Sequence, residues 1–276
     1  MLADTYGYLT DLVRRRSSMS LDERQVPWVE SRLAPLARSL GEESVEALLT
    51  RMRLQGEGDL HDLVVQSVAV NETSFFRDPS TFAELAHEVL PAATARRGRS
   101  RPLRIWSAGC SSGQEPYSVA MVAHELSRDS GCVDASVLAT DFCVEMVERT
   151  RLGRYSNLEV NRGLPARLLV QHMTREGAHW RVRPELAAMV TSARHNLATE
   201  PPPVDAVDVL LLRNVLIYFE RDVRRRVLDS VAEVLVPGGF LVLGASESAL
   251  STHPDFARGR AGTAPWFRFE PKGSGR

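Results

Sequence analysis

The stretch that decides the fold is Leu103–Pro116, which reads LRIWSAGCSSGQEP. It begins like a short β-strand, its middle contains Gly109 and Gly113, and a helix is predicted from Pro116 to about Ser127. A strand, a glycine turn and a helix in this order form the first unit of a doubly wound α/β domain. Because glycine lets the backbone approach a ligand closely, this turn is a candidate binding site.

Taken alone, the glycine turn also fits a purely structural tight turn. Gly109 and Gly113 do not complete the Gly-x-Gly-x-x-Gly fingerprint of dinucleotide-binding domains, and the sequence has no Walker lysine for phosphates. A nucleoside without phosphates suits this turn better than a phosphate does.

A second strand is predicted at Val137–Thr140, and Asp141 follows it directly. An acidic side chain at this point can accept hydrogen bonds from both ribose hydroxyls of a nucleoside. The alternative is an N-cap aspartate for the next helix, which is predicted to end near Gly153. Asp141 and the glycine turn together favour the ligand site.

We read Val207–Leu212 as a continuous apolar run, as expected for a central parallel strand that is covered on both faces. Arg213–Phe219 follows at its carboxyl end, where open sheets bind ligands. Tyr218 could point its hydroxyl into a cleft there or be an ordinary half-buried tyrosine. The later elements are predicted as a helix at Arg221–Val236, a strand at Phe240–Gly244 and an antiparallel last strand at Trp266–Phe269.

The alternation of strands and helices breaks between about Tyr155 and Asn196. Trp180–Arg183 alternates like an exposed antiparallel strand, and the segment is too long for a simple crossover. We interpret residues 155–195 as an inserted β subdomain.

Residues 1–70 carry only helical signals. Leu9, Leu12 and Val13 share one face at helical spacing, and Ser20–Glu23 predicts a capping box that starts a second helix. Further helices are predicted at Ser44–Arg53 and Leu60–Val70, which makes a small all-α domain.

The loop Asn71–Asp78, which reads NETSFFRD, joins the two predicted domains and places the Arg77 guanidinium beside two phenylalanines. Those phenylalanines are expected in the core. Asp78 is predicted to cap a helix that runs to about Leu90. The arginine-rich stretch Ala95–Arg101 is interpreted as an exposed, solvated linker.

Composition excludes several classes of protein. The 276 residues are 43% hydrophobic and 25% charged, which is typical of a globular protein, and the formal net charge of -1 offers no field to attract nucleic acid. The three cysteines show no CxxC spacing, so neither disulfides nor a metal site is predicted. Without a signal-peptide pattern or an apolar stretch of roughly 20 residues, we expect a cytoplasmic protein that is not inserted in a membrane.

Four motifs in order resemble the CheR family of chemotaxis-receptor methyltransferases, and the resemblance runs from about residue 10 to 250. They are NETSFFRD at 71–78, WSAGCSSGQEPYS at 106–118, ATD at 139–141 and RNVLIYF at 213–219. The resemblance implies an S-adenosylmethionine-dependent, Rossmann-like class I methyltransferase domain at residues 71–276, with a small antiparallel β subdomain inserted. An all-α domain at residues 1–70 would precede it.

The resemblance also implies which residues act. Arg77 and Tyr218 match the family positions closest to the transferred methyl group, and are our candidate catalytic residues. Asp141 would bind the ribose, and Glu115 would meet the methionyl end. The remaining cofactor-binding candidates are Asn71, Thr73, Arg77 itself, Gly109, Asn196, Leu197, Arg213 and Asn214, with Asn196 and Leu197 at the adenine.

The implied reaction is methylation of glutamate carboxylates on the cytoplasmic domain of methyl-accepting chemotaxis receptors, by a monomer. The alternatives are a methyltransferase that acts on RNA or a small metabolite, because this fold hosts many substrates, and a non-catalytic scaffold. Ala245 departs from the family, since many relatives have histidine there, and no chemistry is expected at that position.

Overall fold

The computed structural model describes residues 1–98, 101–130, 133–247, 253–259 and 264–271. The chain divides into two compact units. The helical unit comprises Met1–Val70 and Tyr218–Arg224, and the α/β unit comprises Asn71–Ile217 and Arg225–Arg276.

The helical unit is built around one buried core. Leu9, Leu12 and Val13 are fully buried on one face of the first helix, as predicted. Its elements are α1 (Ala3–Ser17), the 3-10 turn η1 (Glu23–Gln25), α2 (Val26–Ser39), α3 (Val45–Leu54) and α4 (Asp59–Ser67).

The start of α2 differs from the prediction. The capping box is formed by Asp22 and Gln25 rather than by Ser20 and Glu23. Ser20 is held elsewhere, because its amide donates to the carbonyl of Tyr218 at 3.2 Å. Together with a β-bridge between Met19 and Phe219, this bond ties residues 218–224 to the helical unit. The sequence pattern did not predict that association.

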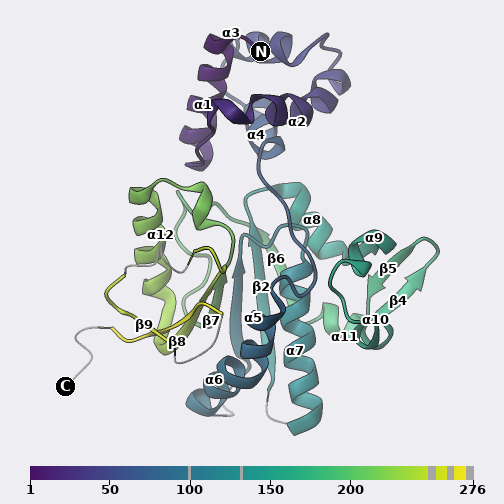
Figure 1. The fold of residues 1–276 in the computed structure, drawn as a ribbon, viewed down its shortest axis with the longest axis vertical. Helices are drawn as coiled ribbons and strands as arrows, with labels where there is room; N and C mark the ends of the chain where they lie inside the picture. The colour runs from purple at the N-terminus through teal and green to yellow at the C-terminus, as the bar shows by residue number, and fades with distance from the viewer. Residues whose placement is uncertain (99–100, 131–132, 248–252, 260–263, 272–276) are drawn as a thin grey trace. The chain divides into compact units, whose positions relative to one another are not determined.

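The α/β unit contains a seven-stranded sheet of order β6-β2-β1-β7-β8-β10-β9, which confirms the predicted doubly wound class (Figure 1). β6, β2, β1, β7 and β8 are parallel, and β10 and β9 add antiparallel pairs at one edge. The strands are β1 (Leu103–Ala108), β2 (Ala135–Asp141), β6 (Val190–Arg194), β7 (Val207–Leu212), β8 (Leu235–Leu243), β9 (Phe256–Arg258) and β10 (Trp266–Phe269).

Helices connect and cover these strands. From β1 the chain moves to β2 on one side of the sheet, and from β7 it moves to β8 on the other side. Because both crossovers are right-handed, α7 (Gln114–Ser130) and α12 (Arg221–Val234) lie on opposite faces of the sheet. The helical elements are α5 (Pro79–Glu84), the π-helical turn η2 (Leu85–Val89), α6 (Leu90–Arg97), α7 (Gln114–Ser130), α8 (Val144–Leu152), the 3-10 turn η3 (Leu216–Tyr218) and α12 (Arg221–Val234).

The junction between α12 and β8 lies earlier than predicted. The helix ends at Val234, and the strand begins at Leu235, before the Pro-Gly-Gly sequence. Leu235 pairs with Val207, and the register shifts before Val209 pairs with Phe240. A strand irregularity therefore accommodates the proline and the two glycines.

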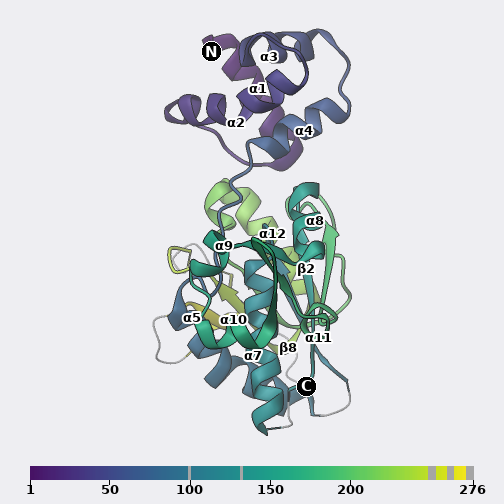
Figure 2. The same cartoon turned by 90° about the vertical axis from the view of Figure 1, so that its right-hand side faces the viewer.

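A second, three-stranded antiparallel sheet of order β3-β5-β4 forms the predicted inserted subdomain (Figures 1 and 2). It consists of β3 (Arg154–Ser156), β4 (Met173–Glu176) and β5 (His179–Val182), with α9 (Asn157–Asn161), α10 (Ala166–His172) and α11 (Pro184–Ala187). Val190–Arg194, which the sequence reading placed inside the insertion, is β6 of the main sheet and pairs with β2.

Asp208 changes two sequence-based interpretations. It interrupts the run that we read as apolar, and its side chain is fully buried in β7. Arg96 contacts its carboxylate at 2.6 Å, and Arg101 contacts it at 2.6 and 3.0 Å. These two arginines are therefore anchors on the sheet, and not members of a solvated linker.

Within the described residues, no helix is long and apolar enough to cross a membrane.

Candidate functional site

The predicted turn follows β1, at the point where the strand order reverses between β1 and β7. Gly109 has φ +76°, and a Cβ atom there would lie 2.5 Å from Cγ2 of Val215. The amides of Gly109 and Cys110 donate to the carbonyl of Thr140 at 2.8 and 2.9 Å. Glycine is therefore required where this turn packs against the segment after β7 and the end of β2.

Asp141 lies at the carboxyl end of β2 and is buried. Its Oδ2 accepts the amide of Ser111 at 2.8 Å, and its Oδ1 accepts the amide of Cys143 at 2.9 Å. Burial raises the pKa of Asp141, and backbone amides, including those of Cys143 and Ser111, oppose that rise. A carboxylate has about four lone-pair positions, so beside the amides of Ser111, Phe142 and Cys143 it keeps capacity for a ligand hydroxyl.

The loop Asn71–Asp78 reaches the same turn. Ser111 Oγ donates to the carbonyl of Asn71 at 2.7 Å, and the amide of Phe76 donates to Ser118 Oγ at 3.0 Å. Phe75 is fully buried, with its ring edge-on to Tyr155 of β3 at 5.0 Å. The structure thus joins the loop, the glycine turn and the inserted subdomain within the α/β unit.

Arg213 connects three parts of the site at the end of β7. One of its Nη atoms lies 2.8 Å from Glu115, and the other lies 2.8 Å from Asp78 and 2.7 Å from the carbonyl of Arg77. The other oxygen of Glu115 accepts a hydrogen bond from Ser107 at 2.8 Å. Two cofactor candidates, Glu115 and Arg213, therefore form a buried ion pair with each other.

Asp78 does not act as the predicted side-chain cap of α5. Its backbone has φ +61°, its side chain makes no cap bond, and its carboxylate binds Arg213 instead. Sequence reasoning missed this role, because a distant arginine outcompetes the local amides for the carboxylate.

Backbone strain gathers at the same place. Among the described residues, the non-glycine positions with positive φ are Ser18, Phe76, Asp78, Ser111 and Asn214. Apart from Ser18, which ends α1, all belong to the loop, the glycine turn or the end of β7. Left-handed backbone is costly for such residues and occurs preferentially at binding and catalytic sites.

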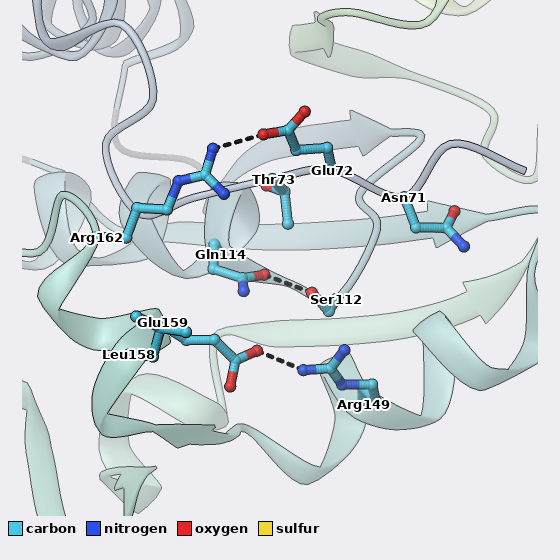
Figure 3. Close-up of a pocket in the computed structure, with 9 residues that line it drawn as sticks. All are labelled: Asn71, Glu72, Thr73, Ser112, Gln114, Arg149, Leu158, Glu159 and Arg162. Atoms are coloured by element: carbon cyan, nitrogen blue, oxygen red, sulfur yellow. Dashed lines mark hydrogen bonds and ion pairs between the residues drawn. The ribbon is translucent and has the colours of Figure 1, made fainter. Parts of the chain in front are cut away.

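A cavity of about 340 Å³ lies beside the loop and the turn (Figure 3). Two of the predicted residues, Asn71 and Thr73, line it. Of its other lining residues, Glu72, Ser112 and Gln114 lie in the predicted motifs without an assigned role, and Arg149, Leu158, Glu159 and Arg162 were not predicted. Arg162 pairs with Glu72, and Arg149 pairs with Glu159, at the wall of this cavity. The first pair joins residues that are far apart in sequence, and no local pattern predicts it.

The remaining cofactor candidates lie around this edge of the sheet. Asn196 is buried just after β6, and the amide of the preceding His195 donates to the carbonyl of Asp141 at 3.0 Å. Asn196 Oδ1 accepts the amide of Ala198 at 3.1 Å, and Leu197 between them is half-buried. Asn214 follows Arg213 and is half-buried with φ +58°.

The two catalytic candidates belong to different units. Arg77 is half-buried in the α/β unit, and its Nη1 donates to the carbonyl of Glu72 at 3.0 Å. Tyr218 is grouped with the helical unit. Their approach to a common substrate stays a prediction.

The residues present fit a nucleoside that carries an amino-acid tail. The strand-end carboxylate of Asp141 suits ribose hydroxyls, and the tight turn at Gly109 lets backbone come close. Neither residue lines the cavity itself, which lies beside Asn71 and Thr73. Among the residues that the structure describes, no group accepts a hydrogen bond from Nε of buried Arg213, which leaves one donor for a further acceptor.

A group of possible metal ligands lies apart from these residues. His124, Glu125 and His172 place ligand atoms within 4.8 Å of one another. The Glu125 carboxylate already binds Arg167 at 2.5 Å and lies 3.3 Å from His172. We assign no metal to this group.

Comparison with known proteins places the chain in a family. Residues 71–263 match the family model described as CheR methyltransferase, SAM binding domain, where SAM is S-adenosylmethionine. "Chemotaxis protein methyltransferase Cher2" of Pseudomonas putida is 36% identical over 239 residues, covering 85% of this chain and 86% of that protein. "Chemotaxis protein methyltransferase 1" of Pseudomonas aeruginosa is 39% identical over 231 residues, covering 82% and 83%. The chain belongs to the CheR methyltransferase family.

Proposed function

We propose that this protein uses S-adenosylmethionine to methylate glutamate carboxylates on the cytoplasmic domains of chemoreceptors. The products are glutamate methyl esters and S-adenosylhomocysteine. The observation that carries the proposal is the meeting of the four family motifs at one edge of the sheet, through Asn71, Ser111, Asp141 and Arg213, in a chain of this family.

Each binding residue has a proposed role. Asp141 accepts the ribose hydroxyls, Asn196 and Leu197 contact the adenine, and Gly109 lets the turn approach. Glu115, Arg213 and Asn214 line the end of the pocket that takes the methionyl group, with Asn71, Thr73 and Arg77 on the opposite loop. The ion pair of Glu115 with Arg213 supports this arrangement, because it fixes both side chains before a ligand binds.

S-adenosylmethionine supplies a methyl group on a positively charged sulfur. The substrate carboxylate needs no strong general base, since a glutamate with a pKa of about 4.3 is already ionised at neutral pH. The protein's task is to hold that carboxylate in line and to replace its water with fixed donors. We assign this orienting role to Arg77 and Tyr218.

The donors must not bind the carboxylate too strongly. Its negative charge is largest in the ground state, so a tight interaction would stabilise the reactant more than the transition state. The Arg77 guanidinium already donates to the carbonyl of Glu72, which supports an orienting role over a full ion pair with the substrate.

The proposed product also changes the charge of the receptor. Each methyl ester removes one negative charge from a receptor helix and so relieves repulsion between packed helices. A cytoplasmic, monomeric enzyme with a helical domain at residues 1–70 and a methyltransferase domain at 71–276 is the organisation that we propose for this reaction.

The function is tested with purified protein, S-adenosylmethionine carrying a radiolabelled methyl group, and cytoplasmic receptor fragments. We expect label in the fragment that alkali releases as methanol, because esters hydrolyse and amines and amides do not under these conditions. Fragments with the methylated glutamates replaced by alanine should take up no label. Label that resists alkali, or that enters RNA instead, would reject the proposal.

A further inference from the structure

Glu247 lies in the loop after β8 and is fully buried, although no motif pointed to it. Its Oε2 accepts the amides of Asn214 at 2.6 Å and Gly244 at 2.9 Å. Its Oε1 accepts the amides of Val215 at 2.8 Å and Ile217 at 3.3 Å. One carboxylate thus gathers backbone donors from the ends of β7 and β8.

The chain around Glu247 is shaped to admit this carboxylate. A Cβ atom at Gly244 would lie 2.7 Å from Glu247 Oε2 and 2.9 Å from Asn214 Nδ2. Asn214 has φ +58°, a left-handed conformation that asparagine adopts more readily than most residues with a side chain. The bond from the Asn214 amide to Glu247 holds the backbone in that conformation.

The segment that Glu247 holds is the one that contacts the glycine turn. Val215 donates its own amide to Glu247, and its Cγ2 lies 2.5 Å from where a Cβ atom at Gly109 would be. Arg213 and Asn214 open this segment, and Tyr218 follows Ile217 directly. A shift of the segment would therefore move the cofactor candidates and the glycine turn together.

Building on the proposed function, we infer that Glu247 is a positioning residue for the cofactor pocket, which acts by fixing the backbone of residues 214–217. The requirement is for an acceptor-only group. A carboxylate presents acceptors to all of these amides, whereas the NH2 of an isosteric glutamine would face amide donors and repel them. A buried amide that loses its acceptor must find another, and the segment has to move for that.

Ala245 and Ser246, in the same short loop, are exposed and provide the contrast. The family departure at Ala245 lies on the surface of this loop, while the glutamate two residues later lies inside it. This arrangement explains how the loop can change at one position and still hold the end of β7.

The test is titration calorimetry of Glu247→Gln with S-adenosylhomocysteine, beside thermal melts and far-UV circular dichroism. We expect affinity to fall at least about tenfold, equal to about 1.4 kcal/mol, in protein that retains its native spectrum. The matched control is Glu233→Gln, which changes an exposed glutamate of α12 and should bind like the wild type.

Two further variants keep the inference testable if Glu247→Gln does not fold. Gly244→Ala adds a methyl group against the Glu247 carboxylate and should weaken binding in the same direction. Glu247→Asp retains the charge on a shorter arm and should bind more weakly than the wild type, but more tightly than Glu247→Gln where that variant folds. In kinetics, the KM for S-adenosylmethionine should rise in all three while the KM for the receptor fragment changes little.

The outcomes separate this inference from the proposed function. If the wild type binds S-adenosylhomocysteine and folded Glu247→Gln and Gly244→Ala bind equally well, Glu247 does not position the pocket. If the wild type itself does not bind, the proposed function fails first. A fall in melting temperature with unchanged affinity would show a purely structural role and overturn the inference.

Discussion

Asp141 and Asp208 are both buried aspartates on neighbouring parts of one sheet, yet their surroundings are opposite. Asp208 is close to the start of β7 and binds Arg96 and Arg101. Burial favours a raised pKa for Asp208, but the hydrogen bond from Arg101, the amide of Arg104 and the charges of both arginines outweigh it and lower the pKa. Asp141 lies at the end of β2, and burial leaves its pKa raised, because only backbone amides oppose it.

The different surroundings of the two carboxylates indicate a structural residue in one case and a binding residue in the other. A carboxylate that is matched by arginines has its hydrogen-bonding capacity filled by the protein, and the lowered pKa of Asp208 means that its ionised form stabilises the fold. A carboxylate that is held by backbone amides alone, as Asp141 is by three of them, keeps some capacity for a ligand, and its desolvation is tolerated at a cost in stability. Such uncompensated groups are typical of binding sites.

The largest effect should come from breaking the matched group. We expect Asp208→Ala to lower the free energy of unfolding by about 3–5 kcal/mol, because it leaves two partly buried arginines without their partner. Chemical denaturation measures this. Asp205→Ala, at an exposed aspartate nearby, should change stability by less than about 0.5 kcal/mol. Similar values for the two variants would remove the distinction between the aspartates.

Asp141→Asn should affect cofactor binding more than it affects stability. We expect the KM for S-adenosylmethionine to rise roughly thirtyfold, or about 2 kcal/mol, because hydrogen bonds from the ribose hydroxyls to a charged acceptor are lost. Stability at neutral pH should fall by less than in Asp208→Ala, because the asparagine NH2 faces one amide donor of the backbone, while removing an ionised side chain with a raised pKa recovers folding energy. Steady-state kinetics and thermal melts test both parts. A destabilised variant with normal KM would make Asp141 a structural residue like Asp208.

The contrast between functional and structural residues can also be tested at the two catalytic candidates. Arg77→Ala and Tyr218→Phe should each reduce methyl transfer at least about tenfold, or about 1.4 kcal/mol, with the fold intact, because each loses a donor that orients the substrate. Arg175 also donates to a carbonyl but lies exposed on β4, so Arg175→Ala is the control for Arg77→Ala. Tyr8→Phe is the control in the helical unit. Near-normal turnover in both site variants would reject the assigned roles.

The smallest effect concerns pH. Because the pKa of Asp208 is lowered, its stabilisation is present above the usual aspartate value of 3.8 and is lost as pH falls through its lower folded pKa. Asp141 has a raised pKa, so its contribution is most favourable below 3.8 and declines as pH rises through its folded pKa. In denaturation between pH 3 and 7, the stability of Asp141→Asn relative to wild type should therefore increase with pH. A decrease would contradict the sign of the shift.

Local pattern predicted much of the fold. β7 has the predicted bounds, the glycine turn follows β1, and Gly153 ends α8 as expected, because these features depend on residues close in sequence. Long-range pairs were not predictable in this way. Arg101 with Asp208 and Arg213 with Asp78 join residues more than one hundred positions apart, and each changed an interpretation based on neighbours.

The candidate site shows the same division. The motifs placed Asn71, Asp141, Glu115 and Arg213 at one edge of the sheet, as the structure has them. The contacts of Glu247 were not predicted, because a single glutamate after a strand has the sequence pattern of a surface residue. The structure shows that it accepts four backbone amides, three of them from residues about thirty positions earlier. Tyr218 was predicted at the end of the β7 strand. The structure assigns it to the helical unit, where Ser20 bonds its carbonyl and Met19 forms a β-bridge with Phe219.

Calorimetric titration with S-adenosylhomocysteine tests most directly whether the carboxyl edge of this sheet is the cofactor site. We predict one binding event for the wild type and for the surface control Asp205→Asn, and affinity at least roughly thirtyfold weaker for Asp141→Asn. The absence of binding by the wild type, or equal affinity of Asp141→Asn and the wild type, would contradict the account.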